Sequence, residues 1–507
     1  MKTIGGNKIF VEEKGRGVFL DFGMNFAKHG VFFEEFLTER SSRGIHDLAY
    51  LGLIPKANIY RSDLIPSDLN VAGYSKLDVN AVLLSHAHLD HCGNLGLLRE
   101  DIPVVASNVS IAVLKALRDT SQPGIGSEIS YFSKKNPIEG NGLVLESETS
   151  GCYFGRDFCC SNNISEKLRA FTSQRPGQDS PKARKKVQPG KLCCLQESDL
   201  PFEVHAYDVD HSIYGASAYL LKGEKTIAYT GDFRLHGKMA DKTRNFLSKA
   251  KAASILIIEG TRINRKNDSA TEETVFQKCL GAVEESKKLT VADFSARNFE
   301  RLDMFIKIAR ETGKQLDITA KDAYMLHAMG CAQGDCQMEK EDIAIYKELK
   351  DRKKIKWETE TVMDKWDDRY ISHTKISNDP GEYVLCFSFF DLKHLLDIKP
   401  NGGAYIYSSS ESFSEEQDID FVRLWKWLKS FNMKSYGFTM VGDGTKAKPD
   451  FPSGYHASGH ASEREIEEVI DKVDPDFIIP VHTEDSEWFK KRFDNTIIPE
   501  EGKPIKF

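Results

Sequence analysis

Short apolar runs recur along the chain, each bounded by turn-forming residues such as Gly, Asp, Ser or His. Runs of this kind predict β-strands. They fall at Val18–Phe22, Ala81–Ser85, Val104–Ala106, Thr226–Thr230, Ile255–Glu259 and Phe477–Val481. Longer segments with apolar residues three or four positions apart predict amphipathic helices at Thr271–Lys287 and Asn298–Thr312. Strands and helices in such alternation are typical of an α/β fold.

The positions of the histidine-containing motifs indicate how the chain divides into domains. At 507 residues the chain is long enough for two or three domains of roughly 150 residues each. Further strand-like runs lie at Leu289–Asp293, Leu316–Thr319, Tyr383–Phe387 and Ala404–Ser408. The histidine motifs described below stop before this stretch and resume after it. We therefore predict a first domain over residues 1–260, completed by residues 456–507, and an α/β domain inserted over residues 261–455.

Hydropathy argues against a membrane protein. The strongest apolar runs are only strand-length, far below the roughly 20 residues of a membrane span, and residues 1–10 contain no extended apolar segment. We expect a cytoplasmic protein with no membrane partner. The formal net charge of −7 does not by itself indicate a polyanionic partner.

Residues 150–195 form a predicted insertion with its own composition. Between Ser165 and Lys191 there are eight basic residues against two acidic ones, together with several Pro and Gly. This composition predicts a mobile basic loop, either simply solvated or in contact with nucleic acid.

Five of the ten cysteines lie in the same insertion, at Cys152, Cys159, Cys160, Cys193 and Cys194. Their spacing lacks the C-x2-C pairs of zinc ribbons and fingers. Reduced thiols in a surface insertion are therefore favoured over a structural zinc site. The cysteines are also too sparse along the chain for a disulfide scaffold.

The strongest chemical signal follows the predicted strand Ala81–Ser85, where His86, His88, Asp90 and His91 lie within six positions. Residues two apart at a strand end point to the same side, so His86 and His88 can converge on one ion. Asp90 and His91 then face a neighbouring position. Imidazole and carboxylate groups are the ligands expected for zinc and similar ions.

This H-x-H-x-D-H motif resembles the signature of the metallo-β-lactamase superfamily, which implies an αββα sandwich. Three further residues occur in the order that the resemblance implies: Asp21 in VFLDFG, His211 in VDHSI and Asp232 in YTGDF. By the same resemblance, His86, His88 and His211 hold one ion, Asp90 and His91 hold a second, and Asp232 bridges them. Asp21 is expected to orient the site.

Later motifs narrow the resemblance to the β-CASP nucleases. The sequences of these motifs are most similar to those of ribonuclease J-like proteins. They are Glu259 at the end of an apolar strand, His460 in Ser-Gly-His-Ala and His482 in Pro-Val-His. The resemblance implies that His482 completes the second metal's ligands. It also implies that His460, Glu259 and Asp90 take part in catalysis, and that residues 261–455 are the inserted β-CASP domain.

The resemblance further implies two divalent cations, Zn²⁺ first and Mn²⁺ as the alternative. Ser295 and Arg297 follow the strand Leu289–Asp293 at the start of a helix, where backbone N–H groups favour phosphate. Ser295 resembles the serine that holds a terminal 5′ phosphate, and Arg297 can add a charge-assisted bond. Ser458 and Ser410 are weaker phosphate-binding candidates, and ordinary helix capping is the alternative role for Ser295.

The expected function is a metal-dependent ribonuclease that cuts RNA from 5′ to 3′, with endonuclease action also open. A DNA-specific β-CASP nuclease is one alternative, because contacts to the RNA 2′-hydroxyl are not readable from the sequence. A small-molecule hydrolase of the metallo-β-lactamase fold is another, but it does not account for the long segment between Glu259 and His460. A non-catalytic RNA-binding scaffold is least favoured, and self-association into a homo-oligomer is left open.

Overall fold

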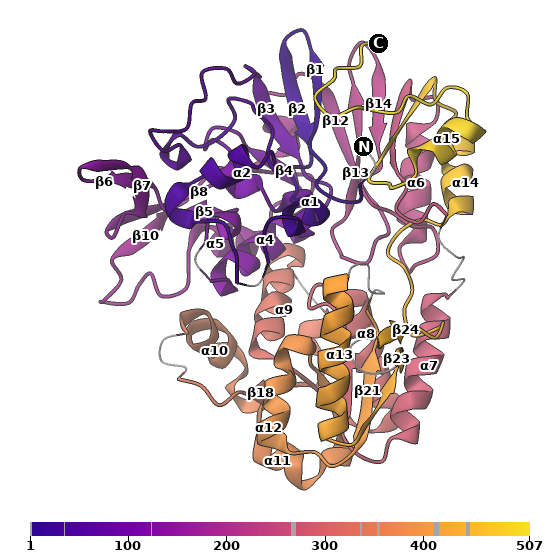
Figure 1. Cartoon of the computed structure of the whole chain (residues 1–507). Helices are drawn as coiled ribbons and strands as arrows, with labels where there is room; N and C mark the ends of the chain where they lie inside the picture. Colours follow the sequence, from indigo (N-terminus) through magenta and orange to yellow (C-terminus); the bar gives the residue numbers. More distant parts are fainter. Residues whose placement is uncertain are drawn as a thin grey trace.

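The computed structural model of the chain describes residues 3–34, 36–122, 124–264, 270–334, 337–351, 355–409, 415–442 and 447–507. Two sheets lie together in one half of the molecule, drawn uppermost in Figure 1, and a third sheet forms the other half. The first half contains both the earliest and the latest parts of the chain, and the two ends lie near each other (Figure 1).

The first sheet has six strands: β1 (Ile9–Glu13), β2 (Arg16–Leu20), β3 (Val79–Leu83), β4 (Val104–Ala106), β9 (Phe158–Cys160) and β11 (Leu192–Cys194), in that order. Only β1 pairs antiparallel with its neighbour in this sheet. The second sheet has five strands: β12 (Glu203–Asp208), β13 (Ser217–Lys222), β14 (Thr226–Tyr229), β15 (Ile255–Glu259) and β25 (Phe477–Val481). The last strand, β25, joins β15 in parallel although it lies more than 200 residues later.

These two sheets pack face to face. Val18 and Leu83 of the first sheet share one buried cluster with Tyr219 and Ile257 of the second. Because strand side chains alternate between faces, the intervening residues point outward to helices. On one side these include α4 (Asn108–Thr120), and on the other α6 (Ala240–Ala250), α14 (Glu463–Val473) and α15 (Ser486–Arg492). The result is an αββα sandwich.

The third sheet is entirely parallel and has seven strands: β19 (Tyr370–Ser372), β18 (Ile343–Lys347), β17 (Gln315–Ile318), β20 (Tyr383–Cys386), β16 (Thr290–Asp293), β21 (Gly403–Tyr407) and β22 (Met433–Tyr436). Its two faces are covered by separate apolar clusters. The helices of this half are α7 (Glu272–Glu285), α8 (Phe299–Thr312), α9 (Ala320–Gln333), α10 (Met363–Trp366), α11 (His373–Asn378), α12 (Leu395–Ile398) and α13 (Glu415–Ser430).

Both predicted helices in this region form, with caps that explain where they start. The Thr271 side chain accepts a hydrogen bond from Thr274 N at the start of α7, and the Asn298 side chain accepts one from Arg301 N at the start of α8. Strand β15 ends at Glu259 and β25 begins at Phe477, so the chain leaves the five-stranded sheet after the first strand and rejoins it at the second. The boundaries at residues 260 and 455 themselves remain predictions.

The prediction of a mobile basic loop between Ser165 and Lys191 is wrong, because α5 (Glu166–Ser173) and β10 (Lys185–Gln188) form there. The whole segment 150–195 also contains β8 (Gly151–Gly155), β9 and β11. Strands β8 and β10 pair with each other and with β5 (Tyr131–Phe132) in a small sheet, while β9 and β11 extend the six-stranded sheet. The cysteines Cys159, Cys160 and Cys193 are buried rather than exposed. These strands were not predicted from the sequence, because they are short, contain few apolar residues and lie among many charged ones.

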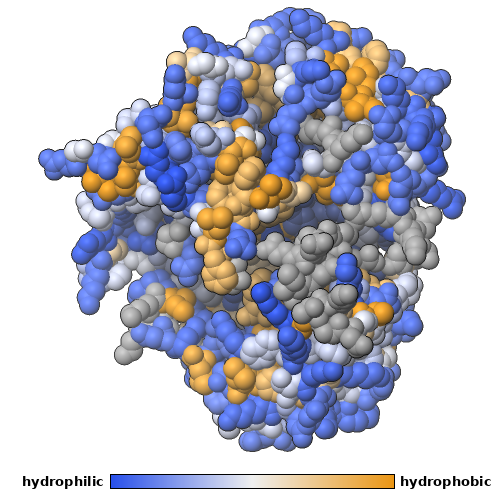
Figure 2. Space-filling view, in the orientation of Figure 1, coloured by the Kyte–Doolittle hydropathy of each residue, from blue (hydrophilic) through white to orange (hydrophobic). Residues whose placement is uncertain are grey.

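Two smaller pairs and three short helices complete the architecture: β6 (Lys135–Ile138) with β7 (Asn141–Ser147), β23 (Thr439–Val441) with β24 (Lys448–Asp450), α1 (Phe26–Gly30), α2 (His46–Tyr50) and α3 (Leu89–Cys92). Among the described residues, no helix has the length and apolar character needed to cross a membrane. The visible face is mostly hydrophilic (Figure 2). Apolar groups interrupt it near the centre of the view, where Figure 1 places α1, and Phe26, Val31 and Phe32 are among the exposed apolar side chains.

Candidate metal centre

The predicted metal ligands gather where strands of both sandwich sheets end. The segment from His86 to His91 follows β3, and His211 lies between β12 and β13. Asp232 follows β14 and His482 follows β25. Since β14, β15 and β25 are parallel, their carboxyl ends open at one edge of the second sheet, which is where sites in α/β sheets form. The structure brings all seven predicted ligands together at this edge.

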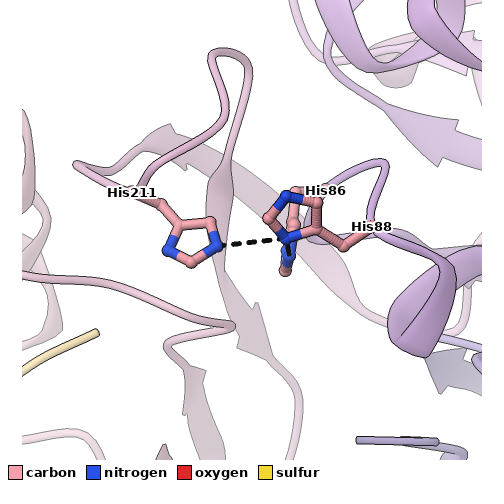
Figure 3. Close-up of side chains that lie close together, drawn as sticks. All are labelled: His86, His88 and His211. Atoms are coloured by element: carbon pink, nitrogen blue, oxygen red, sulfur yellow. Dashed lines mark hydrogen bonds between the residues drawn. The ribbon is translucent and has the colours of Figure 1, made fainter. Parts of the chain in front are cut away.

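Three imidazole rings form the first ligand set. His86 Nε2 lies 3.0 Å from His88 Nδ1, and His211 Nε2 lies 3.3 Å from the same His88 atom. Figure 3 shows the three side chains pointing toward one another, with His211 approaching from a different segment. Three ring nitrogens at this spacing match the N-donor arrangement around one tetrahedral ion.

The second set comprises Asp90, His91 and His482, whose ligand atoms lie within 4.8 Å of one another. His482 Nε2 is 3.2 Å from Asp90 Oδ2. Asp232 lies between the two sets, because its Oδ2 atom is 3.1 Å from His91 Nε2 and 3.7 Å from His86 Nε2. Asp232 therefore lies within reach of both sets of candidate ligands.

Oxygen atoms next to the Nδ1 atoms of four histidines fix the orientation of their rings. Each contact involves a ring Nδ1: His86 with Ser85 Oγ at 3.0 Å, His91 with Asp21 Oδ2 at 2.7 Å, His211 with Gly459 O at 2.6 Å and His482 with Thr261 Oγ1 at 2.9 Å. The Nε2 atom of each of these rings is therefore left for a metal. Such outer contacts are characteristic of histidine ligands.

Asp21, predicted to orient the site, contacts a candidate ligand and its neighbours. Its carboxylate accepts hydrogen bonds from Ser85 N at 2.6 Å and from the Tyr229 hydroxyl at 2.6 Å, in addition to its contact with His91. Asp21 is fully buried. Ser85, Tyr229 and Thr261 were not identified from the sequence, because a lone Ser, Thr or Tyr beside a ligand has no distinctive spacing.

The donor chemistry fits divalent cations. Among the described residues, His91 Nε2 and Asp232 Oδ1 are buried and have no hydrogen-bond partner, which is costly unless another group binds them. Burial lowers the pKa of His86 and His88 well below the ordinary value and that of His211 to about 4, so these rings are neutral. Neutral imidazoles are the form that binds metal.

The carboxylates supply the compensating negative charge. Burial alone would raise the pKa of Asp232, but the surrounding histidines, His482 foremost, hold it well below the ordinary value. The pKa of Asp90 is also lowered, because His91 and His482 outweigh the effect of burial. Anionic carboxylates beside imidazole nitrogens are a donor set suited to divalent cations.

Unusual backbone conformations place two of these residues. Asp21 and His482 have positive φ angles of 59° and 51°, which non-glycine residues seldom adopt. Gly23 has a different role, since a Cβ atom there would lie only 1.6 Å from Asp90 O. The chain after β2 therefore packs directly on the ligand segment, and only glycine permits this approach.

His460 and Glu259 form a pair beside the metal ligands. His460 Nδ1 lies 2.9 Å from Glu259 Oε2, and Glu259 Oε1 accepts a hydrogen bond from Phe233 N at 2.9 Å. Burial would lower the pKa of His460, but Glu259 and Asp232 outweigh it and raise the pKa to about 9. A pKa in this range favours the protonated form of His460 at neutral pH.

The predicted phosphate-binding residues are less closely grouped. Arg297 Nη1 donates to Ala87 O at 3.0 Å, which places this guanidinium next to the His88 segment. Ser295 is exposed, and the cap of α8 is Asn298, so the alternative role of Ser295 as helix cap is wrong. Ser458 Oγ accepts from His460 N at 3.1 Å. Ser410 lies outside the described residues.

A buried arginine near the site was missed from the sequence. Arg234, two residues after Asp232, donates to Asp210 at 3.0 Å and to Glu272 at 2.9 Å, and it also pairs with Glu300. Glu272 and Glu300 belong to α7 and α8. This network therefore ties the sandwich that carries the candidate metal ligands to the inserted half, through charges that share no local motif.

Comparisons with known proteins agree with this geometry. Residues 54–149 match the model of the Metallo-beta-lactamase superfamily, and residues 454–502 match the Zn-dependent metallo-hydrolase RNA specificity domain. The search of curated proteins found no match. A crystal structure described as a protein of unknown function from Enterococcus faecalis V583 has a TM-score of 0.66 and 21% identity, covering 99% of this chain and 97% of that one.

At this level of identity the solved structure shows the fold alone. The predicted α/β class and the αββα sandwich of the metallo-β-lactamase type are confirmed. The segment that matches the second model contains both His460 and His482. Two segments of the chain therefore match the Metallo-beta-lactamase superfamily and the Zn-dependent metallo-hydrolase RNA specificity domain, a combination that fits the β-CASP group and supports a metal-dependent hydrolase.

Proposed function

We propose that the protein is a ribonuclease that hydrolyses RNA phosphodiester bonds with two divalent cations, Zn²⁺ first and Mn²⁺ as the alternative. The observation that carries this proposal is a pair of ligand sets joined by Asp232, with the protonated His460 beside them. The match of residues 454–502 to an RNA specificity domain supports RNA as the substrate.

Two ions in these sets would lower the pKa of a shared water towards about 7 and stabilise charge on the phosphate oxygens. The protein's own groups perform the other tasks. Glu259 accepts the Nδ1 proton of His460, which leaves the Nε2–H to donate to a phosphoryl or leaving oxygen. Glu259 is itself held by Phe233 N, so the imidazolium is oriented before substrate arrives.

A 5′-to-3′ direction is proposed from the inserted half. Ser295 and Arg297 lie in the loop between β16 and α8, and Arg297 contacts the backbone beside His88. A 5′ phosphate bound by the exposed Ser295 hydroxyl would hold the end of the RNA near the metal centre. Successive removal of nucleotides from that end would then follow from a fixed distance between the two sites.

The deciding experiment offers labelled RNA with a 5′ monophosphate, triphosphate or hydroxyl, and DNA of matching sequence, to protein loaded with Zn²⁺ or Mn²⁺. We expect mononucleotides from 5′-monophosphate RNA. Internal fragments would contradict the exonuclease mode, and cleavage of DNA alone would favour the DNA-specific alternative. No cleavage of any polynucleotide would contradict the proposed function.

A matched pair of variants shows whether cleavage belongs to the metal centre. His86→Ala removes a ligand of the first set, whereas His205→Ala removes a half-exposed histidine on β12 that pairs with Glu203. We expect cleavage to disappear only in His86→Ala. Equal activity in the two variants would assign the cleavage to a contaminating nuclease or to another site.

A further inference from the structure

Strands β9 and β11 bring two pairs of cysteines into register. They pair in parallel, with Cys159 opposite Cys193 and Cys160 opposite Cys194. Because successive residues of a strand face opposite sides of its sheet, the four thiols divide into two pairs on two faces. A zinc site with four thiolates is therefore excluded by the register.

Cys159 and Cys193 share the face that looks into the core between the two sandwich sheets. Their Sγ atoms lie 2.8 Å apart, closer than the about 3.5–4.0 Å at which unbonded carbon atoms pack. Cys160 instead belongs to the cluster on the helix-covered face. The sulfur atoms of Cys159 and Cys193 are therefore in direct contact.

These two strands form the base of a long excursion. Between Cys160 and Leu192 the chain leaves the sheet, forms α5 and β10, and contacts the inserted half of the molecule. Ser165 Oγ donates to Cys331 O at 2.7 Å, Lys167 Nζ donates to Gly334 O at 2.8 Å, and Gly177 N donates to Glu360 Oε2 at 2.6 Å. A bond across the base would close this excursion into a loop.

We propose that Cys159 and Cys193 are a redox modification site that forms a reversible disulfide and fastens the base of the excursion. The oxidant is a low-molecular-weight disulfide. A Cys193 thiolate attacks one sulfur of the oxidant and releases the first thiol. Cys159 then displaces the second thiol from the mixed disulfide. The protein loses two protons and two electrons, and one oxidant molecule becomes two thiols.

The position of β11 gives the oxidant a route. It is the edge strand of the six-stranded sheet, and it is only three residues long. Burial raises the pKa of Cys159, so this thiol reacts slowly while β11 is paired with β9. Exchange therefore begins when β11 separates from β9, and the contact geometry restores the pair when the strand returns.

The experiment incubates the folded chain with oxidised glutathione until the number of free thiols stops changing. We expect the count to fall by two from ten, with a peptide joining Cys159 to Cys193, and the change to reverse in dithiothreitol. Closing a loop of this length is expected to raise Tm and to slow proteolysis within residues 161–191.

Three single variants test the assignment. Cys159→Ser and Cys193→Ser should each abolish the crosslink, while Cys160→Ser, which alters the other face, should retain it. A crosslink between Cys160 and Cys194 would overturn the proposal. So would a folded protein that keeps all ten thiols while the same oxidant consumes them in urea. If one Ser variant is unfolded by circular dichroism, the other and Cys193→Ala provide the same test.

Discussion

The metal centre and the loop between β16 and α8 differ in how far their groups are fixed. His86, His91 and Asp232 are buried, and each ring is held from behind by an oxygen atom. Ser295, in contrast, is exposed, and its contact with Arg297 N is 3.5 Å, beyond a normal hydrogen bond. The folded chain thus prearranges the groups proposed for bond cleavage, whereas the hydroxyl of Ser295, proposed to bind the 5′ phosphate, is exposed and held by no short hydrogen bond.

The largest effect should come from the carboxylate shared by both ligand sets. Asp232→Ala leaves both sets incomplete, so cleavage should fall by more than about 10³-fold, exceeding the loss of a single electrostatic donor. Far-UV circular dichroism should be unchanged, because Asp232 lies after the end of β14 and the substitution alters no residue of that strand. Activity near that of the unmodified chain would break the two-metal proposal.

A smaller loss is expected from Glu259→Gln, about 10²-fold in kcat. The pKa of His460 is raised to about 9 by Glu259 and Asp232. The protonated form therefore persists below this pH and is lost as pH rises through about 9. Without the Glu259 charge the pKa falls, so the decline in kcat should begin at lower pH. A decline at the same pH in both proteins would contradict the role given to Glu259.

Removal of an outer contact should weaken metal binding without removing a ligand. Thr261→Val takes away the hydroxyl beside His482 Nδ1, and we expect zinc affinity to fall by about 10–100-fold. Competition with a chelator measures this change. Thr312→Val is the matched control, because it removes a hydroxyl on α8 that donates to carbonyl groups of its own helix. This variant should leave the zinc affinity unaltered.

The smallest change is expected at the loop. Ser295→Ala should reduce the preference for 5′-monophosphate RNA over 5′-hydroxyl RNA by about 10-fold, the value of one hydrogen bond to a charged group. Cleavage of 5′-hydroxyl RNA should stay the same. An equal loss on both substrates would mean that Ser295 supports the loop itself, and the contrast between the two regions would then weaken.

Sequence order located most of the candidate ligands, because β3, β14 and β25, which precede His86, Asp232 and His482, are recognisable apolar strands. The supporting residues could not be found in this way. Ser85 and Thr261 contact the rings of His86 and His482 only in the folded structure. Arg234 contacts Glu272 and Glu300 only when the inserted half packs against the sandwich.

Errors arose where charge concealed strands. The basic segment around Lys185 was interpreted as loop, although Lys185 and Val187 alternate as buried residues of β10. Strand β12 was also missed, because Glu203, His205 and Asp208 lend it a polar composition. In both cases pairing with neighbours outweighed local composition, a contribution that no single segment reveals. The roles assigned to individual site residues stay predictions.

The late position of β25 has a consequence for when the centre forms. A chain under synthesis acquires His86, His88 and His211 long before His482, which arrives only with the strand that pairs with β15. The first ligand set can therefore assemble on a partial chain, but the second remains open. A ribosome-bound chain with the proposed ribonuclease activity therefore stays inactive toward the message that encodes it until β25 and His482 have been made.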